Sequence, residues 1–277
     1  MKTMKKNVIS ALITIGLLAI LSQNLFASPR RDTTTASTDT SVLRVGATPV
    51  PHAELLNLIR EDLAARGIEL RIIEFTDYVA PNSALMLGDL DANFFQHRPY
   101  LESNPTWRDS LVPAFGVHLE PLGLYSRSIT NIADLANNAR IAIPNDPSNG
   151  GRALLLLQSK GFITVNPNAG LRPTTRDITS NPRNFRIIEL EAAQLPRALE
   201  DVEAAVINGN FAIGAGFNPA RDALLLEGED SPYVNYVVVR RGNENNPAIQ
   251  AFSEVLRSQK VRDYIDRTWN GSVLAAF

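Results

Sequence analysis

The sequence predicts an α/β protein made of two lobes that are joined by two crossing strands. Strand and helix patterns alternate in two separate units, one beginning near residue 43 and one near residue 140. Two segments rich in β-forming residues flank the second unit. The length of 277 residues allows a substantial core, and 44% hydrophobic with 20% charged residues is the composition of an ordinary folded protein.

The first 27 residues have the order of an export signal. Three lysines within the first six residues precede an uncharged apolar run over 8–21, which leads to the small-residue site Ala27-Ser28. Because the run is shorter than the ~20 residues of a membrane-spanning helix, we expect a signal peptide over 1–27. An uncleaved N-terminal anchor is the alternative, and in both cases the body lies outside the cytoplasm.

Residues 28–42 are expected to form a disordered tether, since the stretch is rich in Ser, Thr, Asp and Arg. The sequence contains no cysteine, so it offers neither disulfides nor a thiol for acylation. We therefore expect a periplasmic or envelope-associated protein without a cysteine lipid anchor. A formal net charge of -2 gives no electrostatic basis for binding nucleic acid.

The first lobe is predicted from residues 43–125 and 236–277. Apolar residues at helical spacing follow a short strand, and a glycine ends each of the first two helices. In chain order we expect a strand at 43–46, a helix at 53–66, strands at 68–75 and 90–93 with a helix at 82–87 between them, and a C-terminal helix at 247–269.

The second lobe is predicted from residues 126–235. A polar turn at 145–151 separates its first strand from its first helix. The expected strands are 140–144, 185–189 and 204–207, and the expected helices are 152–160 and 194–202. The segments 122–129 and 233–240, rich in β-formers, are expected to cross between the lobes.

The sequence shows no pattern that is typical of an enzyme. It contains no H-E-x-x-H or G-x-S-x-G motif, and Gly214-Ala215-Gly216 lacks the third glycine of a dinucleotide loop. The three histidines, His52, His97 and His118, are widely scattered along the chain. We therefore expect no catalytic residues, no metal site and no cofactor.

Two segments gather aromatic and amide side chains near predicted strand ends, at 75–82 and 91–102. In the second segment Phe94, Phe95, His97 and Tyr100 follow the expected strand, and Pro99 indicates that the chain turns there. Aromatic residues at a strand end can line a pocket. Burial of the two phenylalanines in the core is the alternative.

Several long motifs in order resemble the methionine-binding lipoprotein family of bacterial ABC importers, the NlpA and MetQ type. The similar stretches are "FTDYVAPNSALMLGDLDANFFQHRPYL", "AIPNDPSNGGRALLLLQ", "LEAAQLPRAL", "AVIN" and "SPYVNYVVVRR", within a resemblance that runs from about Leu43 to the C-terminus. The resemblance implies the type II periplasmic-binding-protein fold, two α/β lobes joined by two crossing strands.

The resemblance also implies a ligand site for an amino acid with a thioether side chain. It places Tyr78, Phe95, His97 and Tyr100 around the ligand side chain, where aromatic rings pack well against sulfur. His97 would act as wall and hydrogen-bond donor.

The polar end of the ligand is assigned by the same resemblance. Arg152 would hold the ligand carboxylate through two parallel bonds, helped by Asn149 and by free N–H groups at a helix N-terminus. Asn208 and Asn235 would accept from the ligand ammonium group.

The expected function is binding without chemistry. A monomer closes its lobes on L-methionine or a close derivative and delivers it to an ABC permease in the membrane. One rival hypothesis is an exported surface or adhesin-like protein on the same fold, with a vestigial cleft or a different amino-acid or dipeptide ligand. Another is an exported hydrolase, for which the sequence offers no nucleophile–base pair. Family members usually carry a cysteine after the signal, and this sequence does not.

Overall fold

The computed structural model describes residues 41–228 and 231–277, all within the unit Asp39–Phe277. The expected signal peptide and the expected tether up to residue 40 lie outside the described residues. Ser41 and Val42 do not belong to a tether, because they begin strand β1 and pair with Ile68 and Glu69. Among the described residues, no helix has the length and apolar character needed to span a membrane.

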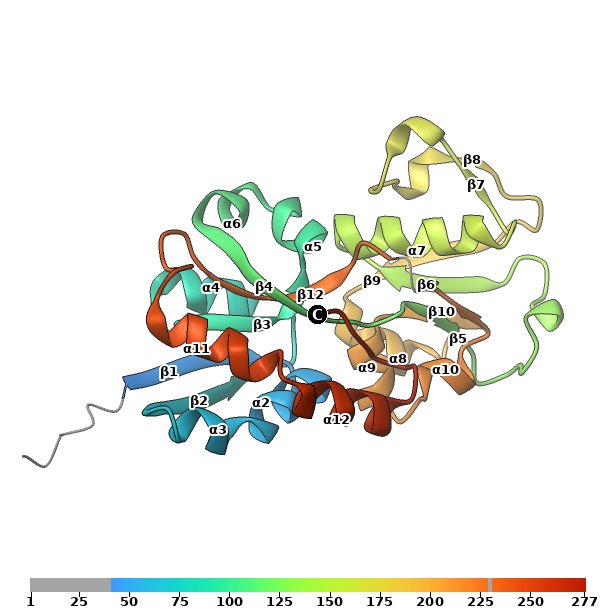
Figure 1. Ribbon diagram of the computed structural model, residues 1–277. Helices are drawn as coiled ribbons and strands as arrows, with labels where there is room; N and C mark the ends of the chain where they lie inside the picture. Colours follow the sequence, from blue (N-terminus) through green and yellow to red (C-terminus); the bar gives the residue numbers. More distant parts are fainter. Residues whose placement is uncertain (1–40, 229–230) are drawn as a thin grey trace, which may run out of the picture. The chain divides into compact units, whose positions relative to one another are not determined.

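A six-stranded sheet organises the first lobe, at the left of Figure 1. Its strand order is β13-β4-β12-β3-β1-β2. Strand β1 is parallel to β2 and β3, whereas β12 is antiparallel to β3 and β4. The strands are β1 (Ser41–Ala47), β2 (Ile68–Glu74), β3 (Ala92–His97), β4 (Leu111–Leu119), β12 (Val234–Arg240) and β13 (Leu274–Ala275).

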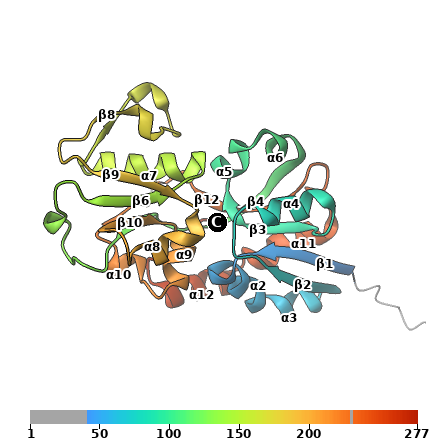
Figure 2. The same cartoon turned by 180° about the vertical axis from the view of Figure 1, so that it is seen from behind.

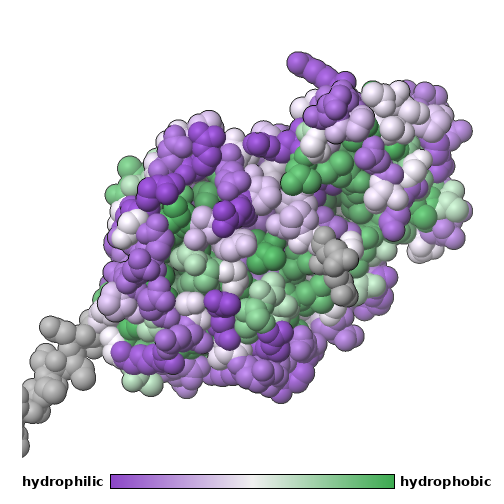
Figure 3. Space-filling model, turned by 45° about the horizontal axis from the view of Figure 1, so that its top comes forward, coloured by the Kyte–Doolittle hydropathy of each residue, from purple (hydrophilic) through white to green (hydrophobic). Residues whose placement is uncertain are grey.

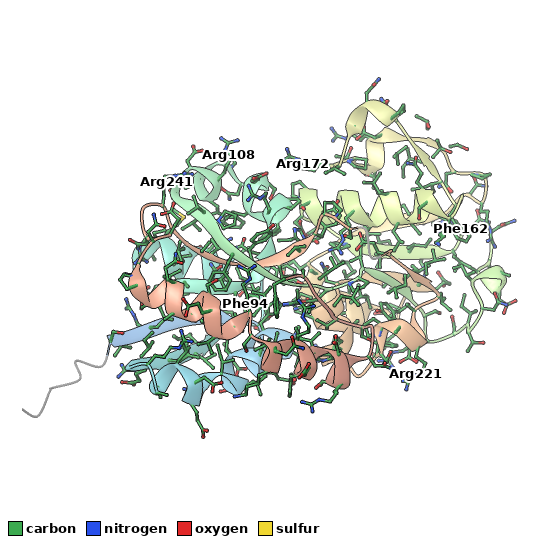
Figure 4. All side chains as sticks on the ribbon, viewed as in Figure 1. Phe94, Arg108, Phe162, Arg172, Arg221 and Arg241 are labelled. Atoms are coloured by element: carbon green, nitrogen blue, oxygen red, sulfur yellow. The ribbon has the colours of Figure 1, made fainter. Side chains whose placement is uncertain are left out.

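Helices cover both faces of this sheet. One face packs on the helical segment η1 (Pro49–Ala53), α2 (Glu54–Leu58), α3 (Arg60–Ala64), α11 (Pro247–Leu256) and α12 (Gln259–Trp269). The other face packs on α4 (Ala80–Leu87), α5 (Arg98–Ser103) and α6 (Pro105–Ser110). Phe94, labelled in Figure 4, is fully buried in the first of these cores.

A five-stranded sheet organises the second lobe, in the order β11-β5-β10-β6-β9. Each sheet contains three parallel strands with the earliest of them in the middle, β3-β1-β2 and β10-β6-β9, and an antiparallel strand, β12 or β5, pairs with the last of the three. Both lobes therefore have the same topology. The strands are β5 (Gly123–Tyr125), β6 (Arg140–Pro144), β9 (Arg186–Leu190), β10 (Ala204–Ile207) and β11 (Leu225–Leu226).

Helices also cover both faces of the second sheet, as Figures 1 and 2 show from opposite sides. One face packs on α7 (Pro147–Ser159), beside the small sheet of β7 (Thr164–Val165) and β8 (Ile178–Ser180). The other packs on α8 (Leu195–Ala198) and α9 (Gly209–Gly214), and α10 (Pro219–Asp222) contacts α9. Short helical turns η2 (Ile132–Asp134), η3 (Pro167–Ala169), η4 (Thr175–Asp177) and η5 (Ala192–Gln194) complete the set. In Figure 3 hydrophilic residues cover much of the visible surface, with hydrophobic patches between them.

The chain passes between the sheets twice, between Leu119 and Gly123 and again between Leu226 and Val234. The first passage falls before the expected boundary at Tyr125, because β5 pairs with β10 and β11 of the second sheet. Pro121, which has no N–H for a sheet ladder, separates β4 from β5. The segment expected to cross over 122–129 is thus a strand only over β5.

The helices differ most from the expected elements. The helix expected at 53–66 is interrupted at Ile59, whose φ of -102° and ψ of 2° are not helical, and the one expected at 247–269 is interrupted after Leu256. Helix α7 begins five residues before the expected start because Asp146 caps it and Pro147 suits its first turn.

Candidate functional site

A pocket lies between the lobes, where the carboxyl ends of parallel strands from both sheets meet. The empty volume of about 320 Å³ at this place includes space that is open to solvent. Ligands of open α/β sheets bind at this end of the strands. All eight predicted binding residues line it, together with four others; the full set is Tyr78, Phe95, Gln96, His97, Tyr100, Glu120, Asn149, Arg152, Asn208, Gly209, Asn210 and Asn235.

Aromatic rings of the first lobe form one wall of the pocket. The Tyr78 ring centroid lies 5.8 Å from that of Phe95 and 5.7 Å from that of Tyr100. The Tyr100 hydroxyl donates to the Tyr78 backbone oxygen at 2.9 Å, which fixes the Tyr100 ring against the Tyr78 backbone. Neighbouring residues of a strand point to opposite faces, so Phe95 lines the pocket while Phe94 packs in the core. Both phenylalanines are buried in a core: Phe94 in the core on one face of the sheet, and Phe95, which also lines the pocket, in the core on the other face.

His97 joins the aromatic wall to the second lobe. Its Nδ1 accepts the Tyr100 backbone N–H at 3.2 Å, so the ring proton is assigned to Nε2, which lies 3.0 Å from Asn149 Oδ1. Burial, helped by the charge of Arg152, lowers the pKa of His97 to about 3. His97 is therefore a neutral wall residue, and its single donor binds Asn149, whereas we expected a donor for the ligand.

The amide side chains form a connected set on the second lobe. Asn149 Oδ1 also accepts from Asn208 Nδ2 at 2.9 Å. The other atom of that amide, Asn208 Oδ1, is buried and has no hydrogen-bond partner among the described residues. A buried acceptor without a donor is unfavourable, so the pocket offers this oxygen to a ligand N–H.

The N-terminus of α7 is not free to bind an anion, contrary to our expectation. Asp146 Oδ1 accepts from the backbone N–H groups of Ser148 at 3.1 Å and Asn149 at 2.8 Å. Asp146 Oδ2 also accepts from Asn149 Nδ2 at 2.9 Å. The capping carboxylate thus takes the position that we expected for the ligand and fixes the orientation of the Asn149 amide.

Arg152 is buried and already holds a carboxylate. Its Nε lies 2.9 Å from Glu227 Oε1, and its Nη2 bonds both Glu227 Oε2 and the backbone oxygen of Glu120. The guanidinium also lies 4.2 Å from the Tyr233 ring centroid. The two parallel bonds that we expected Arg152 to make to a ligand cannot use its Nε edge, because Glu227 occupies that edge. Among the described residues, Nη1 of Arg152 has no partner.

Sequence reasoning missed four lining residues, Gln96, Glu120, Gly209 and Asn210. Glu120 follows β4 directly and Asn210 lies three residues after the end of β10, so their positions near strand ends were a usable signal. Gln96 had no such signal, and it is held inside the first lobe by Asn82 and Asn93.

The histidines at 52 and 118, which we described as scattered, lie together behind the pocket. His118 Nε2 is 2.7 Å and His52 Nε2 is 3.2 Å from Glu120 Oε1. These three side chains place donor atoms within 4.8 Å of one another, a separation at which a metal ion is geometrically possible. His52 Nε2 also lies 3.2 Å from Asn235 Oδ1, which links the cluster to the predicted site.

Comparison with known proteins identifies relatives over most of the chain. Residues 43–277 match the family model described as NlpA lipoprotein. The chain is 42% identical over 273 residues to the membrane lipoprotein TpN32 of Treponema pallidum, covering 98% of this chain and 99% of that protein. It is 40% identical over 211 residues to the D-methionine-binding lipoprotein MetQ of Escherichia coli, covering 75% of this chain and 78% of MetQ.

The solved structures agree with these sequence matches. A nutrient-binding protein from Burkholderia cenocepacia bound to methionine superposes with a TM-score of 0.82 at 42% identity, covering 85% of this chain and all of that one. A periplasmic substrate-binding protein of an ABC transporter from Coxiella burnetii gives a TM-score of 0.80 at 42% identity, covering 84% and 100%. The predicted two-lobed fold is thereby confirmed.

Proposed function

Because the chain belongs to the NlpA lipoprotein family, we propose that it is the substrate-binding protein of an ABC importer and carries methionine in the pocket between its lobes. L-methionine is our first candidate, and D-methionine or a close derivative is the nearest competitor. Relatives named as methionine-binding proteins support this over an adhesin-like role.

One observation carries the proposal: the pocket has an aromatic side and a polar side. Tyr78, Phe95 and Tyr100 offer ring surfaces to an unbranched thioether chain, to which sulfur–aromatic contacts add roughly 0.3–1.5 kcal/mol each. Opposite them, the unpartnered Asn208 Oδ1 suits an ammonium group, and Nη1 of Arg152 suits one oxygen of a carboxylate.

Closure of the two lobes supports a transport role. The Tyr78 hydroxyl donates to Asn210 Oδ1 at 2.5 Å and His97 bonds Asn149, so both bonds join the two lobes at the pocket. A ligand that touches both walls favours this closed form by its differential affinity. We propose that the closed form docks on the membrane permease.

We further propose that the protein acts as an exported monomer and is held without acylation of a cysteine. The pocket is complete within one chain, and the sequence has no cysteine to carry a lipid. Cells grown with labelled palmitate are expected to show no label on this protein, and label that survives purification would contradict the proposal.

The test of the proposed function is calorimetric titration of the ligand-free protein with L- and D-methionine. We expect saturable binding of one ligand per chain. Arg152→Ala should lower the affinity at least tenfold, since a hydrogen bond to a charged group contributes about 1.5–3 kcal/mol. Arg152→Lys should also bind more weakly, because lysine lacks the planar guanidinium.

Arg108→Ala is the matched control, because Arg108 is an exposed arginine on α6 that pairs with Asp109 away from the pocket (Figure 4). Its affinity should equal that of the unaltered protein. No heat with either enantiomer from a folded protein, or equal losses in both alanine variants, would refute the proposed function.

A further inference from the structure

We propose that Glu120 is the anionic pole of the ligand site and receives the α-ammonium group of the bound amino acid. The proposal rests on the function proposed above and adds a requirement on the ligand. The site should bind α-amino acids with a free amino group more tightly than derivatives in which that group is acylated or replaced by a hydroxyl.

Ionisable side chains of both signs line the pocket. Of its lining residues, Arg152 and Glu120 can carry opposite full charges, because His97 is neutral; burial raises the pKa of Glu120. Arg152 pairs with Glu227, which does not line this pocket. Among the described residues no lysine or arginine forms an ion pair with Glu120. The ionised carboxylate of Glu120 thus has no fixed cation beside it, and a cationic ligand group would favour that ionised form.

The histidine cluster holds this carboxylate without neutralising it. Thr48 Oγ1 lies 2.7 Å from His52 Nδ1, so its hydroxyl can donate there and leave the ring proton on Nε2, toward Glu120. Burial lowers the pKa of His52 to about 4 and that of His118 to about 3, so both rings are neutral, and each can donate a single Nε2 proton toward Glu120. Because an isolated buried carboxylate is strongly unfavourable, a cationic ligand group supplies what these donors cannot.

Glu120 and Arg152 lie beside each other in the pocket wall. The guanidinium of Arg152 donates to the backbone oxygen of Glu120, so the cationic and anionic poles of the pocket are adjacent. The ammonium and carboxylate of an α-amino acid are attached to one carbon and need adjacent poles. Asn235, which shares His52 Nε2 with Glu120, lies on the same side.

The distances favour this role over a metal site. Tetrahedral zinc holds nitrogen and oxygen ligands at ~2.0–2.1 Å, which separates neighbouring ligand atoms by roughly 3.3 Å. The separation of 2.7 Å between His118 Nε2 and Glu120 Oε1 is instead that of a charge-assisted hydrogen bond.

The experiment compares two ligands in three proteins. L-methionine and its 2-hydroxy analogue, which lacks the ammonium group, are titrated into the unaltered protein, Glu120→Gln and Glu254→Gln. Glu254 is the matched control, an exposed glutamate on α11. We expect Glu120→Gln to lower the affinity for methionine at least tenfold and the affinity for the hydroxy analogue less than twofold. Glu254→Gln should change neither affinity.

An equal loss of affinity for both ligands in Glu120→Gln, or an unchanged affinity for methionine, would overturn the role of Glu120 while leaving the proposed function intact. A silent titration of the unaltered protein refutes the proposed function itself, and this inference with it. Saturable binding of zinc chloride that competes with methionine and is lost in Glu120→Gln would show a metal site instead. If a melting curve shows that Glu120→Gln does not fold, Glu120→Asp, which keeps the charge but retracts it, should weaken methionine selectively.

Discussion

Gly209 contacts Glu120 so closely that a side chain does not fit between them. A Cβ at position 209 would lie 2.8 Å from Cβ of Glu120 and 3.2 Å from Oε2. Gly214, at the other end of the same helix, has nothing within 4 Å of the corresponding position. The absence of a side chain at 209 therefore lets helix α9 meet Glu120 at the pocket.

We expect Gly209→Ala to destabilise the fold by about 1–3 kcal/mol, the usual cost of overpacking, and to weaken methionine by displacing Glu120 or α9. Gly214→Ala is the matched control and should change stability by less than about 1 kcal/mol, because alanine is the better helix former. Urea denaturation and calorimetry measure both quantities. Equal effects of the two substitutions would contradict this explanation.

At the scale of elements, the N-terminal cap of α7 contributes both to the stability of the helix and to the orientation of a pocket residue. Asp146 caps the first turn and also holds the Asn149 amide, whereas Asn246 caps α11 with a single bond to the Ala248 N–H, away from the pocket. The two caps therefore separate a structural contribution from a contribution to binding.

Replacing either cap, as Asp146→Ala or Asn246→Ala, should lower the free energy of unfolding by about 0.5–2 kcal/mol. We expect only Asp146→Ala to lower the affinity for methionine, because Asn149 then loses one of the hydrogen bonds that orient its amide. Denaturation curves test the first statement and titrations the second. A methionine affinity that survives in Asp146→Ala would show that the amide is oriented by other contacts.

The comparison of sequence and structure is also clearest for the elements. Strands 140–144 and 204–207 were predicted with their observed bounds because they are short, apolar and followed by polar residues. The break at Ile59 and the partnership of Arg152 with Glu227 were not predictable. Both depend on contacts between residues far apart in the chain, for which periodicity has no signal.

The candidate site likewise has features that the sequence predicted and features that it did not. Its eight predicted residues follow from a resemblance to related sequences and do line one pocket, while their contacts with a ligand stay a prediction. His52 and His118 were separated by 66 positions in the sequence. The pairing of β4 with β12, and the turn after β1, bring them to one carboxylate.

At the scale of the whole molecule, the three buried histidines couple stability to pH. Their pKa values fall from 6.5 to about 4 for His52 and to about 3 for His97 and His118, chiefly through burial. As pH falls below 6.5 the unfolded chain therefore takes up protons that the folded state does not. The free energy of unfolding should decrease from about pH 6.5 toward pH 4.

Glu120 has the opposite effect on the pH dependence of stability. Burial raises its pKa above 4.5, so as pH falls the folded state binds this proton at a higher pH than the unfolded chain does. Urea denaturation between pH 7 and pH 5 measures the net slope. His118→Gln should flatten it by up to one proton, about 1.4 kcal/mol per pH unit. An unchanged slope would mean that His118 is not buried in its neutral form.

The central claim is that this chain carries methionine between its lobes. Its most direct test is native mass spectrometry of the protein purified without added ligand, followed by identification of the solute released on denaturation. We predict one methionine per chain, and a loss of that mass in Arg152→Ala but not in Arg108→Ala. A different solute at the same stoichiometry, or a folded protein that is empty and cannot be loaded with either enantiomer, would contradict the claim.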